Sequence, residues 1–269
     1  MPVSPSAQIH PTAIVSAEAE IDDDVQIGAF AIIEGRVRLG AGCIIKPRAY
    51  LIGPLTMGRR NIVFSGAVLG EQPQHLQYRG EPTSLEIGDE NVFRENVTIH
   101  RGTTHSWLTK IGNRNYFMAN SHVGHDCRIG NACLLANGAL IGGHCVLQDN
   151  AFISGNSAVH QFVRIGRLAL LSGMSGTTKD IPPFVMCRGR NSVAGINVIG
   201  MRRAGLTAEQ IHHARQAFRV IYREGLPLNV ALDRLRHEMP DSDVVMEMID
   251  FIRESTRGIT LNVDRSEAA

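Results

Sequence analysis

Histidine and aspartate side chains interrupt an otherwise aliphatic and small-residue stretch between Ser121 and Gly130. The stretch contains His122, His125 and Asp126. Histidine has an unperturbed pKa of about 6.5, so it can accept a proton near neutral pH. A neighbouring carboxylate can orient the imidazole and stabilise its protonated form. These residue types predict a general base at His125 that is supported by Asp126.

The element that must position these residues is a six-residue repeat. From Ile9 onward an aliphatic or aromatic residue recurs at every sixth position, and small residues recur four positions later. The period runs without a break from Ile111 to Leu171. It matches neither an α-helix nor a simple strand pair, and it is typical of a solenoid whose stacked coils bury one continuous column. The sequence therefore predicts a mainly β fold, a parallel β-helix.

The repeat brings further polar residues to one side of the coil. If three hexapeptides make a coil, residues 18 apart stack at about 4.8 Å. The hexapeptides that begin at Val123, Ile141 and Val159 then share a face. The polar residues expected at one edge of these coils are His122, His125, His144, His160 and Gln161. Several histidines in one register predict a site.

The chemistry expected there is direct attack by a substrate. Cys127 and Cys145 fall in the inward column, so no serine or cysteine stands out as a nucleophile. Gly142 and Gly143 leave their backbone N–H groups sterically open, which suits stabilisation of an oxyanion.

Two polar segments interrupt the repeat, near residues 70–86 and 102–109, and we expect external loops there. After residue 184 a connector leads to helical periodicity. Thr207 and Gln210 predict a capping box, and further helices are expected at Asn229–His237 and Ser242–Arg253. The domains expected are a β-helix at 1–184 and a connector with a small C-terminal α-helical domain at 185–269. The tail from residue 264 is expected to fray.

Charge, apolar runs and cysteine content limit the kinds of partner and compartment to be expected. The 269 residues carry a net charge near +1, which does not favour nucleic-acid binding. No run reaches the roughly 18 apolar residues of a membrane span. The five cysteines include no CxxC pair, so we expect a reduced, cytoplasmic protein with no integral membrane segment.

Several short motifs resemble those of the UDP-N-acetylglucosamine O-acyltransferases, a hexapeptide-repeat acyltransferase family that opens lipid A biosynthesis. The matching runs are Thr98–Thr103, His122–Cys127, His160–Gln161, Asp180–Pro183, Asn197–Arg203 and Ser255–Gly258. The resemblance implies a left-handed coil and a homotrimer with its cleft between subunits. It also implies acyl carrier protein and a UDP-amino sugar as partners, and no cofactor or metal.

The same resemblance assigns roles to individual residues. His125 would deprotonate the sugar 3-hydroxyl, which attacks the thioester of a (3-hydroxy)acyl-acyl carrier protein, while Asp126 supports His125 and the Gly143 N–H stabilises the oxyanion. Gly173 would leave room for a long acyl chain, and Asn197 and Arg203 would hold the nucleotide. The remaining substrate-binding residues implied are Gln74, His75, Gln77, His100, His122, His144, His160 and Gln161.

Three departures from the family pattern leave alternatives open. His75, Gln77 and Ile199 replace an acidic residue, a lysine and a glutamate. The first two are implied near the sugar, so a UDP 3-amino sugar acylated on nitrogen is an alternative acceptor. Histidines on stacked coils can also bind zinc, as in the hexapeptide-repeat carbonic anhydrases, so a zinc-dependent hydrase is a second alternative. A solenoid that only binds a partner is the third.

Overall fold

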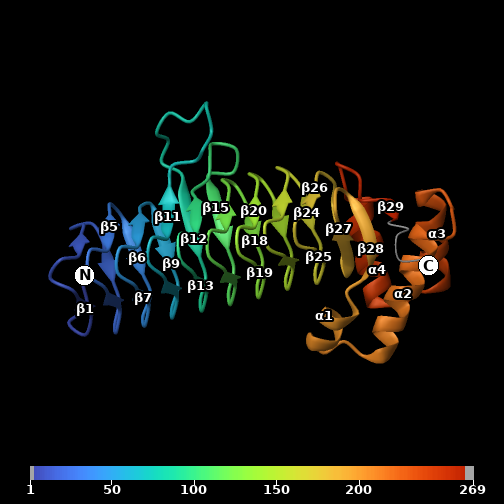
Figure 1. The fold of residues 1–269 in the computed structure, drawn as a ribbon, viewed down its shortest axis with the longest axis horizontal. Helices are drawn as coiled ribbons and strands as arrows, with labels where there is room; N and C mark the ends of the chain where they lie inside the picture. The colour runs from blue at the N-terminus through green and yellow to red at the C-terminus, as the bar shows by residue number, and fades with distance from the viewer. Residues whose placement is uncertain (1–2, 264–269) are drawn as a thin grey trace.

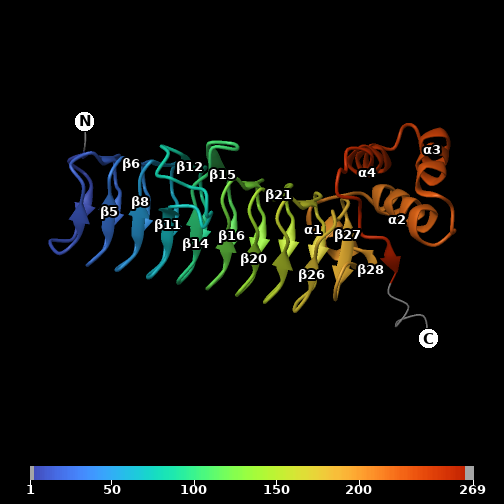
Figure 2. The same cartoon turned by 90° about the horizontal axis from the view of Figure 1, so that it is seen from above.

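A computed structural model describes residues 3–263 as an elongated parallel β-solenoid with helices packed at its C-terminal end (Figures 1 and 2). Three sheets of very short strands form the sides of the coil. The predicted mainly β solenoid of hexapeptide repeats, followed by a small helical region, is confirmed. The left hand stays a prediction, and the frayed tail lies outside the described residues.

The sheets are named here by their first strands. Sheet 1 contains β1 (Gln8–Ile9), β4 (Gln26–Ile27), β7 (Ile44–Ile45), β10 (Ile62–Val63), β13 (Val92–Phe93), β16 (Tyr116–Phe117), β19 (Leu134–Leu135), β22 (Phe152–Ile153), β25 (Leu170–Leu171), β27 (Val185–Arg188), β28 (Ser192–Ile196) and β29 (Asn262–Val263). Sheet 2 contains β2 (Ile14–Val15), β5 (Ile32–Glu34), β8 (Tyr50–Ile52), β11 (Val68–Glu71), β14 (Thr98–His100), β17 (His122–Val123), β20 (Leu140–Ile141), β23 (Ala158–Val159) and β26 (Gly176–Thr177). Sheet 3 contains β3 (Glu20–Ile21), β6 (Val37–Leu39), β9 (Leu55–Met57), β12 (Ser84–Ile87), β15 (Leu108–Ile111), β18 (Arg128–Ile129), β21 (Val146–Leu147) and β24 (Arg164–Ile165).

The repeat arithmetic sets the register between coils. Most strand pairs join residues 18 apart, such as His122 with Leu140. The offset rises to 30 where Leu69 pairs with Ile99, and to 24 where Ile99 pairs with Val123. These increments are whole multiples of six, so the insertions leave the inward phase unchanged. The core column is therefore continuous past both loops.

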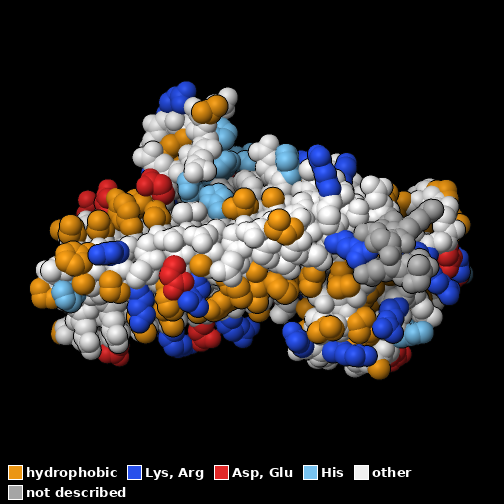
Figure 3. All heavy atoms as spheres, viewed as in Figure 1, with side chains coloured by type: hydrophobic (Ala, Val, Ile, Leu, Met, Phe, Trp, Pro, Cys, Tyr) orange, Lys and Arg blue, Asp and Glu red, His pale blue; other side chains and the backbone are white. Residues whose placement is uncertain are grey.

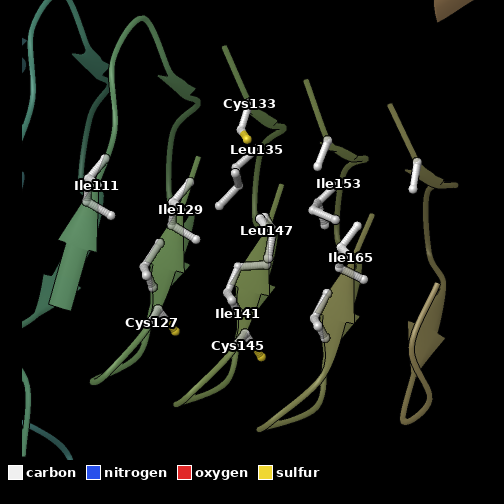
Figure 4. Packing of buried hydrophobic residues seen from close by; sticks show 14 of the residues in the cluster. Ile111, Cys127, Ile129, Cys133, Leu135, Ile141, Cys145, Leu147, Ile153 and Ile165 are labelled. Carbon is white, nitrogen blue, oxygen red and sulfur yellow. The ribbon is translucent and has the colours of Figure 1, made fainter. Parts of the chain in front are cut away.

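The core is the aliphatic column that the period predicts. Ile111, Ile129, Leu147 and Ile165 follow one another along sheet 3 and are at most 3% exposed (Figure 4). The small column fills the space at the corners, and all five cysteines are buried there or in the adjoining hairpin as free thiols. Close packing of this kind makes each coil depend on its neighbours.

Most corners contain a residue in the left-handed backbone region, three positions after an inward apolar residue. Asp126 has a φ of 60° and His144 a φ of 61°. Asparagine and aspartate tolerate this conformation better than most side chains, and they recur at these corners, as at Asn120 and Asn150. The turn that ends each strand thus fixes where the polar side chains point.

Both inserted loops leave the same edge of the prism, between sheet 2 and sheet 3. Loop 1 comprises residues 72–83, between β11 and β12, and loop 2 comprises residues 101–107, between β14 and β15. They rise side by side above the solenoid (Figure 1). Arg101 links them, since its guanidinium lies 3.3 Å from the hydroxyl of Tyr78 and 2.8 Å from the Gly53 carbonyl.

The C-terminal part continues the solenoid before it becomes helical. β27 pairs with β25 in parallel and β28 returns antiparallel to β27. The helices are α1 (Val198–Arg203), α2 (Ala208–Tyr222), α3 (Leu228–Glu238) and α4 (Asp243–Arg253). The predicted capping box at Thr207 and Gln210 is confirmed. The boundary at residue 184 stays a prediction, and the expected connector contains the hairpin and leads into α1.

Within residues 3–263, no helix is long and apolar enough to cross a membrane.

Candidate active site

The edge between sheet 2 and sheet 3 holds the polar cluster. Histidine side chains gather at the base of loop 1 (Figure 3). His125 and Asp126 occupy the corner between β17 and β18, and His144 occupies the next corner, between β20 and β21. The ring centroids of the two histidines are 4.9 Å apart and nearly perpendicular.

His125 and Asp126 form a buried pair. The Nδ1 of His125 lies 2.7 Å from Oδ2 of Asp126, and the two residues are 9% and 5% exposed. A carboxylate accepts this bond from a protonated Nδ1. The neutral ring then carries its lone pair on Nε2, which is the arrangement a general base requires.

Loop 2 keeps the Asp126 carboxylate ionised. Burial alone would raise the pKa of Asp126. Hydrogen bonds from His125, Ser106 and Thr103 outweigh burial and hold that pKa well below its ordinary value. Asp126 is therefore a negatively charged partner for His125 throughout the neutral pH range.

Gly143 lies directly over His125 in the next coil, because the two residues are 18 apart. A Cβ at Gly143 would come 2.8 Å from Cε1 of His125 and 2.9 Å from its Nε2. Among the described residues, the Gly143 N–H donates no hydrogen bond. A side chain here would displace the ring, so glycine is required for the ring to take this position.

The structure refines the expected stacking of the histidines. The residues that stack by 18 are His125, Gly143 and Gln161, whereas His144 stacks between Asp126 and Phe162. The His144 ring lies parallel to Phe162, with centroids 4.2 Å apart, and edge-on to His105 at 4.7 Å. His144 therefore points along the same edge as His125, but from the neighbouring turn position.

His144 and His122 are held largely neutral. Burial lowers the pKa of His144 and outweighs the opposing charge of Asp126. Burial, with the charges of His100 and His125, lowers the pKa of His122 to about 4. His122 points outward from sheet 2, with Nδ1 2.8 Å from the Thr98 hydroxyl, and its ring is 5.2 Å from that of His100.

Of the three substrate-binding residues predicted in loop 1, only His75 lies against the ring of His125. The ring of His75 is 5.2 Å from that of His125 and almost perpendicular to it. Gln74 and Gln77 are exposed on the same loop. His75 is therefore the residue that connects the loop expected to bind the acceptor sugar with His125.

The other predicted residues are spread along the molecule. His160 and Gln161 are exposed at the same edge, one coil beyond His144, and His160 Nδ1 lies 3.5 Å from an Arg257 nitrogen. Gly173 lies at a different corner, between sheet 1 and sheet 2. They do not contact the His125 pair directly.

Asn197 and Arg203 border a separate pocket of about 530 Å³ between α1 and the outer face of sheet 1. Asn197 is 6% exposed, and its amide already donates to the Leu168 carbonyl and accepts from the Gly200 N–H. Asn197 caps α1. Within residues 3–263 the neighbouring Arg203 side chain has no ion-pair partner, and its guanidinium is suited to a phosphate.

The cysteines do not supply a nucleophile. Burial raises the pKa of Cys127, and it raises the pKa of Cys133 to about 12. A thiol that is both buried and protonated is a poor nucleophile. The geometry agrees with a direct attack by substrate.

The metal alternative fits these residues less well. Ligand atoms of His125, Asp126 and His144 lie within 4.8 Å of one another. However, Nδ1 of His125 is bonded to Asp126, and both carboxylate oxygens accept hydrogen bonds from loop 2. A metal would have to displace several of these bonds, so the donor set fits proton transfer better.

Sequence reasoning missed four residues of this cluster, namely Thr103, His105, Ser106 and Phe162. All lie either in loop 2, which has no periodicity, or at a corner usually filled by a small polar residue. The available clue was that the hydroxyl residues of loop 2 occur one coil before His125 and Asp126, at the same edge of the prism.

Comparison with known proteins identifies the family. The family model described as "Udp N-acetylglucosamine O-acyltransferase; Domain 2" matches residues 180–260, and the bacterial transferase hexapeptide model matches residues 18–53 and 108–143. A curated acyl-[acyl-carrier-protein]–UDP-N-acetylglucosamine O-acyltransferase from Anaeromyxobacter sp. (strain Fw109-5) is 52% identical over 94% of this chain and 99% of its own length. The chain belongs to the UDP-N-acetylglucosamine O-acyltransferase family.

Another relative and two solved structures agree. The acyltransferase of the same name from Gloeothece citriformis is 48% identical over 93% of this chain and 91% of its own. LpxA, a UDP-N-acetylglucosamine acyltransferase from Bacteroides fragilis, superposes with a TM-score of 0.85 at 39% identity, covering 96% of this chain and 99% of that one. LpxA from Acinetobacter baumannii gives a TM-score of 0.86 at 37% identity, with the same coverage. The family resemblance found in the sequence is thus confirmed.

Proposed function

We propose that this chain is an acyl-carrier-protein-dependent UDP-N-acetylglucosamine O-acyltransferase of lipid A biosynthesis, with His125 as its general base. The observation that carries the proposal is the buried pair in which Asp126 fixes Nδ1 of His125. Relatives that match nearly the whole chain bear the name of this activity.

The reaction balances with one base. Nε2 of His125 removes the proton of the sugar 3-hydroxyl as its oxygen attacks the thioester carbonyl. The Gly143 N–H, which donates no hydrogen bond to any residue that the structure describes, stabilises the tetrahedral oxyanion. The C–S bond then breaks, and the imidazolium returns its proton to the thiolate of the phosphopantetheine arm. Free thiol and 3-O-acyl sugar nucleotide are the products.

The decisive variant is His125→Ala. Because the base is removed while Asp126 keeps its hydrogen bonds to loop 2, we expect turnover to fall by about 10² to 10⁴-fold with the fold intact. His237→Ala, an exposed histidine in α3, is the matched control. Turnover close to wild type in His125→Ala would sink the mechanism.

The acceptor is tested with a panel. Purified protein is given UDP-N-acetylglucosamine, a UDP 3-amino sugar, or a 3-O-acylated glucosamine nucleotide, each with acyl carrier proteins of several chain lengths and hydroxylation states. Mass spectrometry identifies the product. We expect acylation on oxygen of UDP-N-acetylglucosamine. Acylation of only the amino sugar would show that His75, Gln77 and Ile199 have changed the acceptor.

Metal analysis of the freshly purified protein separates the zinc hydrase. The base mechanism requires turnover to survive treatment with a chelator. Stoichiometric zinc, with loss of turnover on chelation, would favour the alternative.

We further propose a homotrimer, and the two outer faces that are apolar support it. Outward residues of sheet 1 from the third coil onward are Ile44, Ile62, Val92, Tyr116, Leu134, Phe152, Leu170 and Met186. Sheet 2 presents a largely apolar row, in which Thr98 and His122 are the polar interruption; its apolar members include Ile14, Ile32, Tyr50, Val68 and Leu140. Sheet 3 instead presents Glu20, Arg38, Glu86, Lys110 and Arg128. Two different apolar faces on a three-sided prism suit a closed ring in which each subunit uses both faces.

The compartment proposed is the cytoplasm, where acyl carrier protein and nucleotide sugars are made. The five buried free thiols are compatible with a reducing environment.

A further inference from the structure

The loop inserted before β15 holds the carboxylate of Asp126 from one side. Four hydrogen bonds come from only two residues of loop 2, Thr103 and Ser106, each of which uses both its backbone N–H and its hydroxyl. The Asp126 side chain is 0% exposed, so these donors take the place of water.

The two oxygens of Asp126 are held by different groups. Oδ1 accepts from the Thr103 N–H at 3.0 Å, the Ser106 N–H at 3.2 Å and the Ser106 hydroxyl at 2.5 Å. Oδ2 accepts from the Thr103 hydroxyl at 2.7 Å and faces His125 Nδ1, also at 2.7 Å. Rotation of the carboxylate would break several of these bonds at once.

The backbone of Asp126 is held as well. Its N–H donates to the hydroxyl of Thr109 at 2.8 Å, and Thr109 lies in β15, the strand that follows loop 2. Asp126 itself has a φ of 60°. The carboxylate and the backbone of the corner are therefore fixed by a single segment, residues 103–109.

We propose that Thr103 and Ser106 are positioning residues that set the tautomer of His125. They hold Asp126 ionised, with Oδ2 aimed at Nδ1, so the proton of the neutral ring stays on Nδ1 and the lone pair stays on Nε2. This inference rests on the proposed function of His125 as a base. It also gives loop 2 a role, because the four hydrogen bonds from Thr103 and Ser106 to the Asp126 carboxylate all come from this insertion.

The test compares two adjacent threonines. Thr103 is 6% exposed and bonded to Asp126, whereas Thr104 is exposed. Thr103→Val removes one hydroxyl at nearly constant shape, and Thr104→Val is its control. We expect kcat to fall about tenfold in Thr103→Val with KM unchanged, as outer partners of a functional histidine typically contribute. Thr103→Ser, which restores the hydroxyl, should recover most of the loss.

A second variant extends the series. In Thr103→Val/Ser106→Ala, loop 2 keeps only its two backbone donors to Asp126, and we expect kcat about a hundredfold lower. Circular dichroism and thermal melting establish that each variant is folded.

A readout without substrate isolates the positioning role. Nitrogen-15 NMR of the histidine rings reports which nitrogen of His125 carries the proton. We expect protonation at Nδ1 in wild type and Thr104→Val, and a shift of population toward the Nε2–H tautomer in Thr103→Val.

Equal kcat and equal tautomer populations in Thr103→Val and Thr104→Val would overturn the inference. A loss in Thr103→Val that Thr103→Ser does not recover would also overturn it, because the hydroxyl would not be the cause. Failure of wild type to acylate UDP-N-acetylglucosamine would instead remove the proposed function, so the two failures are distinguishable.

Discussion

At the scale of single residues, the site depends on Gly143 having no side chain. Gly143 carries the N–H that is proposed to bind the oxyanion, and the His125 ring fills the space that a Cβ would need. The same glycine thus serves the base and the oxyanion.

Gly143→Ala should therefore lower turnover while the protein stays folded. The added Cβ would meet the His125 ring at 2.8 Å, so the ring must turn away from its working position. A misplaced base or oxyanion donor typically costs about 10²-fold in kcat. Gly155→Ala is the control, since its Cβ would meet only the Asn137 carbonyl at 3.4 Å. Equal kcat values in the two variants, measured by product formation, would contradict this account.

Stability should fall in acid because of the buried histidines. The pKa of His122 is about 4 in the folded protein, below its value of about 6.5 in the unfolded chain. The unfolded chain therefore binds this proton first. The stabilising contribution is present above about pH 6.5 and is lost as the pH falls toward 4.

His122 alone should account for about 3 kcal/mol of this loss, with His100 and His144 adding to it in the same direction. Urea unfolding at a series of pH values measures the slope. His122→Asn should flatten the curve between pH 6.5 and 4, and an unchanged curve would contradict the assignment.

At the scale of the elements, asparagine ladders bind neighbouring coils. The buried ladder runs through Asn61, Asn91 and Asn115, each accepting from the next at 2.9 Å. A more exposed ladder through Asp89, Asn113 and Asn131 lies at an outer corner and runs in the opposite sense, with each backbone N–H donating to Oδ1 of the next residue. The two ladders differ in burial, so water can replace a lost hydrogen-bond partner only in the more exposed ladder.

Asn91→Ala should lower the free energy of unfolding by about 3 kcal/mol, because several bonds among buried groups are lost together. Asn113→Ala should cost less than about 1 kcal/mol, since water solvates the exposed groups it leaves. Chemical denaturation of both variants gives the comparison. Equal losses would show that burial does not set the energy of these ladders.

At the scale of the whole molecule, the three faces of the prism differ in chemistry. Sheet 3 places Lys110 beside Glu86 and Arg38 beside Glu20, as expected of a face in water. Hydrophobic side chains form a band along the lower flank of the solenoid (Figure 3). An apolar face of this length is typical of a buried interface.

Leu134→Glu on sheet 1 should therefore convert the proposed trimer to monomers, because a carboxylate would be buried in the apolar interface. Arg128→Glu on sheet 3 also introduces a carboxylate, on the face left exposed, and should leave the assembly unchanged. Sedimentation velocity gives the mass. A monomeric wild type, or a trimeric Leu134→Glu, would contradict the assembly.

The sequence alone determined the solenoid and the edge at which its chemistry lies. A period of six fixes which side chains face inward, and insertions of whole hexapeptides cannot disturb it. The sequence did not predict the short irregular elements. Helix α1 spans only Val198–Arg203, and the hairpin of β27 and β28 lacks the six-residue period.

Only the tertiary structure decided which polar residues meet. His125 lies over Gly143 rather than over His144, and Asp126 is held by Thr103 and Ser106 across a loop of no periodicity. Hydrophobic periodicity encodes the direction in which a side chain faces. The partners of a side chain depend on corner conformations and loop paths, which are settled when the coils pack.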